Sequence, residues 1–399
     1  MAQLAQRMSR VEGSPTLKVA AEAERLRSLG VDIVDFGAGE PDFSTPEHVT
    51  EAARRALDAH FTKYTTNVGI AELREAIVDR YREWYGVSYR VNDVIVTAGG
   101  KQALYNAALA LFSAGDEVIT HAPGWPTIPE QIKLADATPV VVRTHAEDGF
   151  RLHADAFLAA ITPRTRGIVI NSPTNPTGAL IAEEDMRAIA DEATRRGIWV
   201  VLDLCYERLI YDPVPHNLPG VLGEHHRDRT ILCGSMSKAY AMTGWRCGWA
   251  IGPAHVIKAA AAIQSNATSN VNSIAQKAAQ AALRGSQECV TRMLDEYRVR
   301  RDRIMQLITA DPRMRVVKPS GAFYLFIDVS DLLSVNGIRT SAELAHELLE
   351  EARVVLTPGE AFDAPGFIRI SYATSMDRLQ EGARRIHAFI RSRVGAPAA

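Results

Sequence analysis

Short apolar runs alternate with amphipathic helical stretches through the middle of this 399-residue sequence. The runs have the length and composition of buried strands, and several stretches between them have helical spacing, such as residues 183–196 before Gly197. The expected strands cover residues 93–97, 117–120, 167–170, 198–202, 230–233 and 247–251. This alternation predicts an α/β fold in which a mostly parallel central sheet is flanked by helices.

The order of elements changes from about residue 288. A long charged helix (288–310) is followed by strands near 315–317 and 322–327, a helix at 341–351, strands at 354–356 and 367–371, and a final helix. This order predicts a smaller α+β unit with its own core. We therefore expect a large domain at residues 46–290 and a small domain built from residues 1–45 and 291–399.

Two helices in the first quarter of the chain carry signals at their ends. Residues 46–57 are expected to form a helix with Thr45 as the N-cap and Pro46 in the first turn. Residues 70–85 have helical spacing and are expected to stop at Gly86, because glycine readily adopts the left-handed conformation that ends a helix.

Charge and cysteine content exclude several classes of protein. The formal net charge of -2 offers no basic surface for nucleic acid or for an anionic membrane. No stretch reaches the ~18 uninterrupted apolar residues of a membrane span, and the first residues lack the apolar core of a signal peptide. The cysteines show no CxxC pairing, so we expect reduced thiols in the cytoplasm and no metal site: Cys205, Cys233, Cys247 and Cys289.

A lysine follows one of the apolar strands in the segment GSMSKAYAMTGWRCGW, residues 234–249. A single lysine is usually a solvated surface charge, but Lys238 has unusual neighbours. Ser235 and Ser237 can donate hydrogen bonds to a phosphate, and Arg246 supplies a cation with forked donors. The combination favours a nucleophilic amine beside a bound phosphate group.

Two polar residues follow the strand at 198–202. Asp203 ends this apolar run, where an unpaired carboxylate would be costly. It either caps a helix or faces solvent, or it pairs with a cation such as the pyridine nitrogen of pyridoxal phosphate (PLP), which would help the ring accept electrons. Tyr206 is either a partly buried aromatic residue or a donor to the phenolate oxygen of the same cofactor.

Two glycine- or proline-rich turns also follow strands. The turn NSPTNPTG contains Asn175, which could hold the phenolate oxygen from the side opposite Tyr206, because ligands bind at this edge of open α/β sheets. In TAGGKQALYN, Gly100 begins a helix whose N-terminus attracts phosphate. Lys101 opposes the helix dipole there, so it is either exposed or meets an anion, which would be phosphate or a substrate carboxylate. Neither turn matches a dinucleotide or P-loop motif.

Two further residues are candidates for binding a substrate. Arg369 lies inside the apolar strand FIRISYA, so it either faces solvent or is buried and forms a two-pronged clamp on a carboxylate. Trp125 follows another strand end and either packs in the core or stacks on a cofactor ring.

These segments together resemble the class I aminotransferases, which are PLP enzymes of fold type I, and especially the bacterial aspartate aminotransferase subgroup, some members of which act on prephenate. The resemblance extends almost from end to end of the chain. It rests on the ordered motifs SRVEGSPTLKV, GAGEPDFSTPEHV, KYTTNVGIAELREAI, VTAGGKQALYN, NSPTNPTG, SMSKAYAMTGWR, PSGAFY and IRISYATS.

The resemblance implies a role for each matching residue. Lys238 would be the Schiff-base lysine, Asp203 the partner of the pyridine nitrogen, and Asn175 with Tyr206 the ligands of the phenolate oxygen. Trp125 would stack on the ring. The phosphate would be bound by the backbone of Gly100, Lys101 and Gln102, by Ser235, Ser237 and Arg246, and by Tyr64 from a second subunit, so a homodimer is implied. Arg369 and the backbone of Gly39 would bind the substrate α-carboxylate, and Lys101 a distal carboxylate.

The sequence departs from the family pattern at four positions. Leu204 and Cys205 follow Asp203 where an acidic residue usually comes first, and Gly124 stands where an aromatic residue is common. Both places lie near the expected cofactor and bear on substrate preference. Glu12 is acidic where members acting on prephenate tend to carry a lysine, which speaks against that substrate.

The expected function is transfer of an amino group from an L-amino acid, with aspartate as the first guess, to a 2-oxo acid such as 2-oxoglutarate, by a ping-pong mechanism. Aromatic or specialised-pathway substrates are the main alternative. Other PLP reactions, such as β-elimination or closure of a cyclopropane ring, use similar sites. A DNA-binding regulator built on this fold would need more than the 45 or so residues that precede the large domain, and a NAD enzyme would need a glycine fingerprint.

Overall fold

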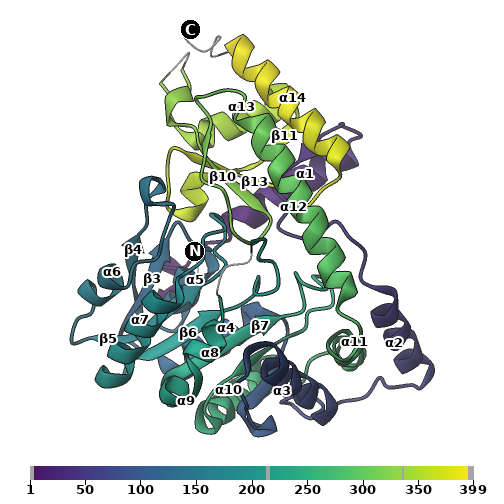
Figure 1. Cartoon of the computed structure of the whole chain (residues 1–399), viewed down its shortest axis with the longest axis vertical. Helices are drawn as coiled ribbons and strands as arrows, with labels where there is room; N and C mark the ends of the chain where they lie inside the picture. Colours follow the sequence, from purple (N-terminus) through teal and green to yellow (C-terminus); the bar gives the residue numbers. More distant parts are fainter. Residues whose placement is uncertain (1–3, 213–215, 335–336, 394–399) are drawn as a thin grey trace.

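In the computed structural model, residues 4–212, 216–334 and 337–393 are described. These residues contain a seven-stranded sheet at the centre of the larger part of the molecule (Figure 1). Its strands are, in spatial order, β2 (Val94–Thr97), β8 (Gly248–Ile251), β7 (Thr230–Ser235), β6 (Trp199–Asp203), β5 (Thr165–Asn171), β3 (Glu117–Ala122) and β4 (Thr138–Arg143). The pairs from β7 to β4 are parallel, and only β8 runs antiparallel to its neighbours. The predicted mostly parallel sheet is therefore confirmed.

Both faces of this sheet are covered, which explains why its strands are apolar at successive positions. Side chains alternate between the faces: Val169 of β5 joins one core, while Ile168 and Ile170 join the other. The first core also contains residues of α4 (Gly100–Leu111), α5 (Thr127–Leu134) and α10 (Ala254–Ala267). The second contains residues of α2 (Glu47–Asp58), α3 (Ala71–Tyr85), α6 (Ala154–Ala159), α7 (Glu183–Arg196), α8 (Leu218–Val221) and α11 (Ser273–Arg284). The short helix α9 (Gly223–His226) follows α8.

A smaller α+β unit lies above the large sheet (Figure 1). Its four-stranded antiparallel sheet has the order β12 (Thr357–Pro358), β13 (Phe367–Ser371), β10 (Tyr324–Asp328) and β9 (Arg315–Val316). The helices α12 (Glu288–Ile308), α13 (Ser341–Ala352) and α14 (Met376–Arg393) contribute to the core behind it. The long helix α12 extends from the large sheet to this unit, and the domain boundaries at 46–290 and at 1–45 with 291–399 stay a prediction.

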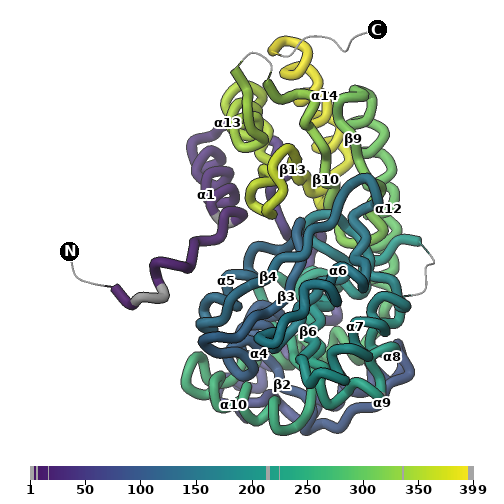
Figure 2. Tube along the Cα trace, turned by 90° about the vertical axis from the view of Figure 1, so that its left-hand side faces the viewer, coloured from purple at the N-terminus to yellow at the C-terminus, as the bar shows by residue number. Residues whose placement is uncertain are grey.

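The N-terminal part of the chain joins the small unit. Strand β1 (Val34–Asp35) pairs in parallel with β11 (Val354–Val355). Helix α1 (Pro15–Ser28) lies on the side of this unit (Figure 2) and packs through Ala23 and Leu26 against Ile33 and Val355. Among the described residues, every helix is too short or too polar to cross a membrane, and all four cysteines are free thiols.

Most predicted elements are present, and the differences have local causes. Gly86 ends α3 at φ 71°, as expected. Thr45 is not the N-cap of α2, because Pro46 holds that position. The Thr45 hydroxyl instead donates to the carbonyl of Ala241 and accepts from the indole of Trp245, at 2.7 and 2.9 Å. The strand expected from residue 322 begins at Tyr324, because Ala322 has a left-handed φ of 58°.

Several elements were not predicted. The edge strand β4, the helices α5, α6, α10 and α11 and the short strands β1 and β12 were assigned to no element from the sequence. Strand β4 is mostly exposed or half-buried, so it lacks the continuous burial that marks the central strands.

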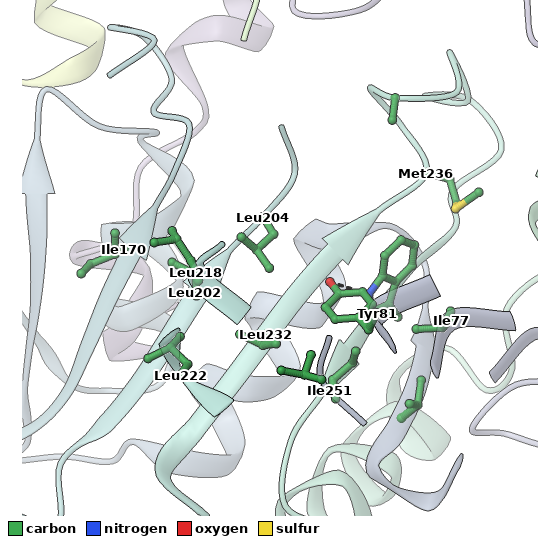
Figure 3. Close-up of a cluster of buried hydrophobic side chains, with 14 of the residues drawn as sticks. Ile77, Tyr81, Ile170, Leu202, Leu204, Leu218, Leu222, Leu232, Met236 and Ile251 are labelled. Carbon is green, nitrogen blue, oxygen red and sulfur yellow. Dashed lines mark hydrogen bonds between the residues drawn. The ribbon is translucent and has the colours of Figure 1, made fainter. Parts of the chain in front are cut away.

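A tryptophan on β8 determines how closely β7 and β8 pack. Gly234 lies opposite Trp249 in the ladder, and the Trp249 indole donates to the hydroxyl of Tyr81 at 3.2 Å. Figure 3 shows Tyr81 of α3 and Ile251 among the buried side chains of the second core. A Cβ added to Gly234 would lie 2.2 Å from Cε2 of Trp249, so only glycine fits without movement of the indole.

We predict that Gly234→Ala lowers the free energy of unfolding by about 1–3 kcal/mol, because the new methyl group overpacks the contact with Trp249. Urea unfolding followed by circular dichroism measures the change. Gly244→Ala is the matched control, since a Cβ there meets no atom within 4 Å. Equal stability of the two variants would contradict the prediction.

Candidate active site

The C-terminal ends of three neighbouring parallel strands meet at one edge of the large sheet. Asn171 ends β5, Asp203 ends β6 and Ser235 ends β7. A cavity of about 570 Å³ lies at this edge and is also lined by α1 and by the small sheet. Open α/β sheets bind ligands at such an edge. Most of the predicted site residues line the cavity: Gly39, Gly100, Lys101, Trp125, Asn175, Asp203, Tyr206, Ser235, Ser237, Lys238, Arg246 and Arg369.

Lys238 follows β7 and lines the cavity with its amine. Its Nζ donates a hydrogen bond to the carbonyl oxygen of Gly39. The same atom lies 5.9 Å from the ring centre of Tyr206 and 5.8 Å from that of Phe323. The amine therefore lies between the segment before α2 and two aromatic rings, within reach of a ligand in the cavity.

Asp203 is a buried carboxylate at the end of β6. The backbone N–H of Cys205 donates to its Oδ1 at 3.0 Å, and no hydrogen bond to Oδ2 is present among the described residues. Burial raises the pKa of Asp203 from 3.8 to about 7, while the Cys205 amide and the charge of Lys238 partly oppose this rise. The carboxyl group is thus suited to a cationic partner inside the cavity.

One corner of the cavity is built to receive an anion. Helix α4 begins at Gly100, and the side chains of Ser235 and Ser237 line the same cavity. Arg246 donates to the carbonyl of Ala98 at 3.1 Å. A Cβ on Gly99 would lie 2.6 Å from Nη2 of Arg246, so this glycine, at φ 82°, allows the guanidinium to approach the helix start.

Lys101 stands between this cavity and a second one. Its Nζ lies 5.1 Å from the ring centre of Trp125. Burial lowers the pKa of Lys101, and the charges of Arg246 and Lys238 lower it further. A neighbouring cavity of about 580 Å³ shares Lys101 and Trp125 with the first and is also lined by the segment before α1 and by residues after β12. An anion bound at Lys101 would relieve its repulsion by the other two cations.

Arg369 lies in β13 and is only 2 % exposed. Its Nη1 donates to Oδ1 of Asn175 at 3.0 Å, and its Nη2 donates to the carbonyl of Gly37 at 2.9 Å and to the hydroxyl of Thr357 at 3.2 Å. Its guanidinium lies 4.3 Å from the ring centre of Tyr324. Burial lowers the pKa of Arg369. All of its described hydrogen-bond acceptors are neutral, so the buried cation can bind a carboxylate.

Asn175 and Tyr206 also line the cavity. The hydroxyl of Tyr206 is 2.8 Å from that of Tyr324. Because Oδ1 of Asn175 accepts from Arg369, its NH2 group stays available as a donor.

Two predicted residues do not line this cavity. The Gln102 amide N–H donates to the carbonyl of Gly99 at 3.1 Å, and its side chain bonds to Ala98 and Thr268. The side chain of Tyr64 is exposed to 90 % on the surface of the chain. The roles given to both residues stay predictions.

The structure places all four residues that depart from the family pattern. Leu204 is buried in the core of the large sheet and is labelled in Figure 3, whereas Cys205 lines the cavity. A Cβ on Gly124 would lie 2.3 Å from the carbonyl oxygen of His121, so the local backbone leaves no room for a side chain. Glu12 lines the second cavity, where its backbone N–H donates to the carboxylate of Glu130 at 2.8 Å.

Sequence reasoning missed several residues that line the cavity. Tyr324 is the last residue of the motif PSGAFY, but the sequence analysis assigned it no role. Gly37, Asp35 and Arg27 also line it. Gly37 lies in the motif GAGEPDFSTPEHV, but only contacts between segments distant in sequence bring these residues to the cavity.

The chain matches a known protein family over most of its length. The family model described as aminotransferase class I and II matches residues 31–386. The aspartate aminotransferase of Geobacillus stearothermophilus is 40% identical over 390 residues, which covers 98% of this chain and 99% of the relative. The aspartate/prephenate aminotransferase of Cereibacter sphaeroides is 41% identical over 395 residues, with 98% and 99% coverage.

Solved structures give the same answer. The aspartate aminotransferase of Thermus thermophilus with maleate superimposes with a TM-score of 0.92 at 41% identity, covering 98% of this chain and 100% of that one. The aspartate aminotransferase of Rhizobium meliloti superimposes with a TM-score of 0.92 at 39% identity, covering 97% and 98%.

The raised pKa of Asp203 gives a prediction for the ligand-free protein. Between about pH 4 and pH 7 the folded chain holds a proton that the unfolded chain has released, so the free energy of unfolding falls as the pH rises. Asp203→Asn removes this pH-dependent contribution to the free energy of unfolding. We predict that its free energy of unfolding, relative to the parent, increases from about pH 4 to pH 7 and is then constant, as denaturant titrations at several pH values would measure.

Asp311→Asn is the control with the opposite sign. The guanidinium of Arg313 lowers the pKa of the Asp311 carboxyl. The variant is therefore less stable than the parent at neutral pH, and this difference in the free energy of unfolding shrinks as the pH falls through the lowered pKa. If the difference in free energy of unfolding between Asp203→Asn and the parent did not change with pH, the assignment of Asp203 as a buried carboxyl with a raised pKa would be contradicted.

Proposed function

This chain belongs to the class I and II aminotransferases and is a PLP-dependent transaminase of fold type I, and from this premise we propose that it transfers the amino group of L-aspartate to 2-oxoglutarate by a ping-pong mechanism. The observation that carries the proposal is that one cavity brings together a lysine amine, a buried carboxylate and a buried guanidinium, namely those of Lys238, Asp203 and Arg369.

The residues of the cavity fit PLP at four points. The Asp203 carboxyl, whose pKa burial raises, is suited to face a protonated pyridine nitrogen. The start of α4 with Ser235, Ser237 and Arg246 is suited to a phosphate group. Asn175 and Tyr206 offer donors for the phenolate oxygen, and Trp125 a ring for stacking. When bound, PLP supplies an aldehyde that takes up the amino group and a ring that withdraws electrons from the reacting carbon.

The residues of the chain bind and orient the substrate. The buried guanidinium of Arg369, whose Nε has no hydrogen-bond partner among the described residues, would bind the α-carboxylate, and the backbone at Gly39 would provide a second contact. This fixes which bond at Cα points to Lys238. The Nζ of Lys238 then takes the proton from Cα and returns a proton during the exchange, as base and as acid.

Lys101 supports a dicarboxylate as the preferred substrate. Its ammonium group lines the cavity, and no ion pair with a carboxylate is present among the described residues. Because burial already disfavours its charge, an anionic group of the substrate gains more there than at the surface. The named relatives are aspartate or aspartate/prephenate aminotransferases, which agrees with a side-chain carboxylate.

We also propose that the active enzyme is a homodimer with shared sites. Tyr64 lines neither of the two cavities described above and is 90 % exposed. A side chain exposed to this extent can reach a second subunit. A phosphate contact from Tyr64 of a second subunit would account for both observations.

The substrate assignment predicts the effect of Lys101→Ser. We expect kcat/KM for aspartate with 2-oxoglutarate to fall about 10–100-fold, because a charged hydrogen bond is lost, while kcat/KM for alanine changes less than about 3-fold. Coupled assays of 2-oxo acid production measure both rates. The exposed Lys318, which lines neither cavity, gives the control variant Lys318→Ser. Equal effects on aspartate and alanine would exclude the role of Lys101.

Converging rather than parallel initial-rate lines would exclude the ping-pong order, and pyruvate release without an amino acceptor would indicate a lyase.

The dimer assignment predicts rescue between subunits. Lys238→Ala and Tyr64→Ala are each expected to be nearly inactive, but a hybrid of the two contains one site with both native residues. We expect about half of the parental activity from this purified hybrid. A hybrid of Lys238→Ala with the Lys238→Ala, Tyr64→Ala double variant has no intact site and is the control. Absence of rescue would contradict sharing of the site.

A further inference from the structure

An aspartate at the end of β1 contacts both α1 and the segment that leads into the active site. Asp35 lines the cavity, and its side chain is 13% exposed. Its Oδ1 accepts a hydrogen bond from the backbone N–H of Gly37 at 2.8 Å. Its Oδ2 accepts from Nη2 of Arg27, on α1, which also makes this contact an ion pair. The carboxylate therefore joins a helix of the cavity wall to the backbone before Gly39.

Gly37 is the point through which Asp35 acts on Arg369. The carbonyl of Gly37 accepts from Nη2 of Arg369 at 2.9 Å. The hydrogen bond to Asp35 fixes the peptide plane before Gly37 and with it the position of the Gly37 Cα, to which the carbonyl is attached, while the bond from Arg369 sets the rotation of the carbonyl itself. Glycine has more backbone freedom than any other residue, so this restraint matters more here than elsewhere.

A larger residue cannot stiffen this position instead. A Cβ on Gly37 would lie 2.9 Å from Cγ1 of Val19 in α1 and 3.3 Å from Oδ1 of Asp35. Close packing against α1 thus requires glycine, and the hydrogen bond from Gly37 to Asp35 replaces the restraint that a side chain would give.

The same segment carries the second contact for a carboxylate. Gly39 comes two residues after Gly37, and its carbonyl accepts a hydrogen bond from Nζ of Lys238. Movement at Gly37 would therefore shift Gly39 and one acceptor of Arg369 together. Asp35 also acts directly on Arg369 by charge, and the ion pair with Arg27 offsets that negative charge, which would otherwise weaken the attraction for a substrate carboxylate.

We propose that Asp35 is a positioning residue for substrate carboxylates: held by Arg27, it fixes the Gly37 backbone and thereby the places of Arg369 and Gly39. The inference rests on the proposed function, because it requires Arg369 to bind the α-carboxylate. It predicts a loss of substrate binding that is the same for every amino acid and 2-oxo acid, since all of them carry that group.

The test uses the PLP-loaded enzyme and three variants. Asp35→Ala removes the acceptor for Gly37, so we expect KM for aspartate, alanine and 2-oxoglutarate to rise together, about 5–10-fold, with kcat within about 2-fold. Asp35→Asn keeps an oxygen acceptor for Gly37 but loses the ion pair with Arg27, so its KM values are expected to match those of Arg27→Met. Arg27→Met is expected to raise the same KM values, and adding it to Asp35→Ala is expected to have no further effect, because Arg27 acts through Asp35.

Calorimetric titration with succinate, a dicarboxylate that has no amino group to react, measures binding without turnover. Its dissociation constant is expected to rise in Asp35→Ala by the same factor as KM. Glu22→Gln is the control on the same helix, since within the described part of the chain Glu22 pairs only with Arg25 and lines neither cavity. Unchanged KM and succinate binding in Asp35→Ala and in Arg27→Met would overturn the proposal, as would a loss confined to kcat or to thermal stability.

Arg369→Lys separates this inference from the proposed function. If that variant raises KM for all substrates while the Asp35 variants do not, Arg369 binds carboxylates but Asp35 does not position it. If Arg369→Lys leaves KM unchanged, the carboxylate site itself is wrongly assigned, and the inference is overturned with it.

Discussion

The buried carboxylate of Asp203 is the interaction on which the rest of the site depends. It stands at the end of the central strand β6, where β5 and β7 flank it and exclude water. One backbone N–H from Cys205 is its described hydrogen-bond donor, which is too little to hold an anion there at its usual pKa. The sheet therefore disfavours the ionised form of Asp203, and a cationic ligand would stabilise that form. This carboxyl lies at the edge of the sheet where the remaining polar residues meet.

A second buried charge, of opposite sign, comes from the other unit. Arg369 lies in the small sheet and bonds to Asn175, which follows β5 of the large one. The contact between the hydroxyls of Tyr206 and Tyr324 likewise joins the two units. Each unit thus contributes one desolvated charge to a shared cavity. A ligand that carries both a cationic and an anionic group, as an amino acid with its cofactor does, satisfies both charges only when the units are held together.

The sequence contained enough information for the strand-end residues and too little for the contacts across units. Parallel strands bring their C-terminal ends to one edge, so polar residues after apolar runs, such as Asp203 and Ser235, could be placed together in advance. The contact between Arg369 and Gly37 joins residues 332 positions apart and has no local signature. Thr45 shows the limit at short range: its type suits an N-cap, but tertiary bonds to Ala241 and Trp245 prevail. The family resemblance supplied the role of Arg369, which spacing alone left open.

The departures from the family pattern have different consequences, because the side chains concerned lie in different surroundings. Leu204 points into the core of the large sheet, so replacing an acidic residue there affects packing and leaves the cavity unchanged. Cys205 lines the cavity next to Asp203, and burial raises the pKa of its thiol to about 12, so it meets a ligand as a neutral group. Under the proposed function we therefore expect substrate preference to depend less on these two positions than on Lys101 and Trp125, which line both this cavity and a second one of similar volume. A cation in that place would favour a substrate with an anionic side chain, because burial already disfavours the charge of Lys101.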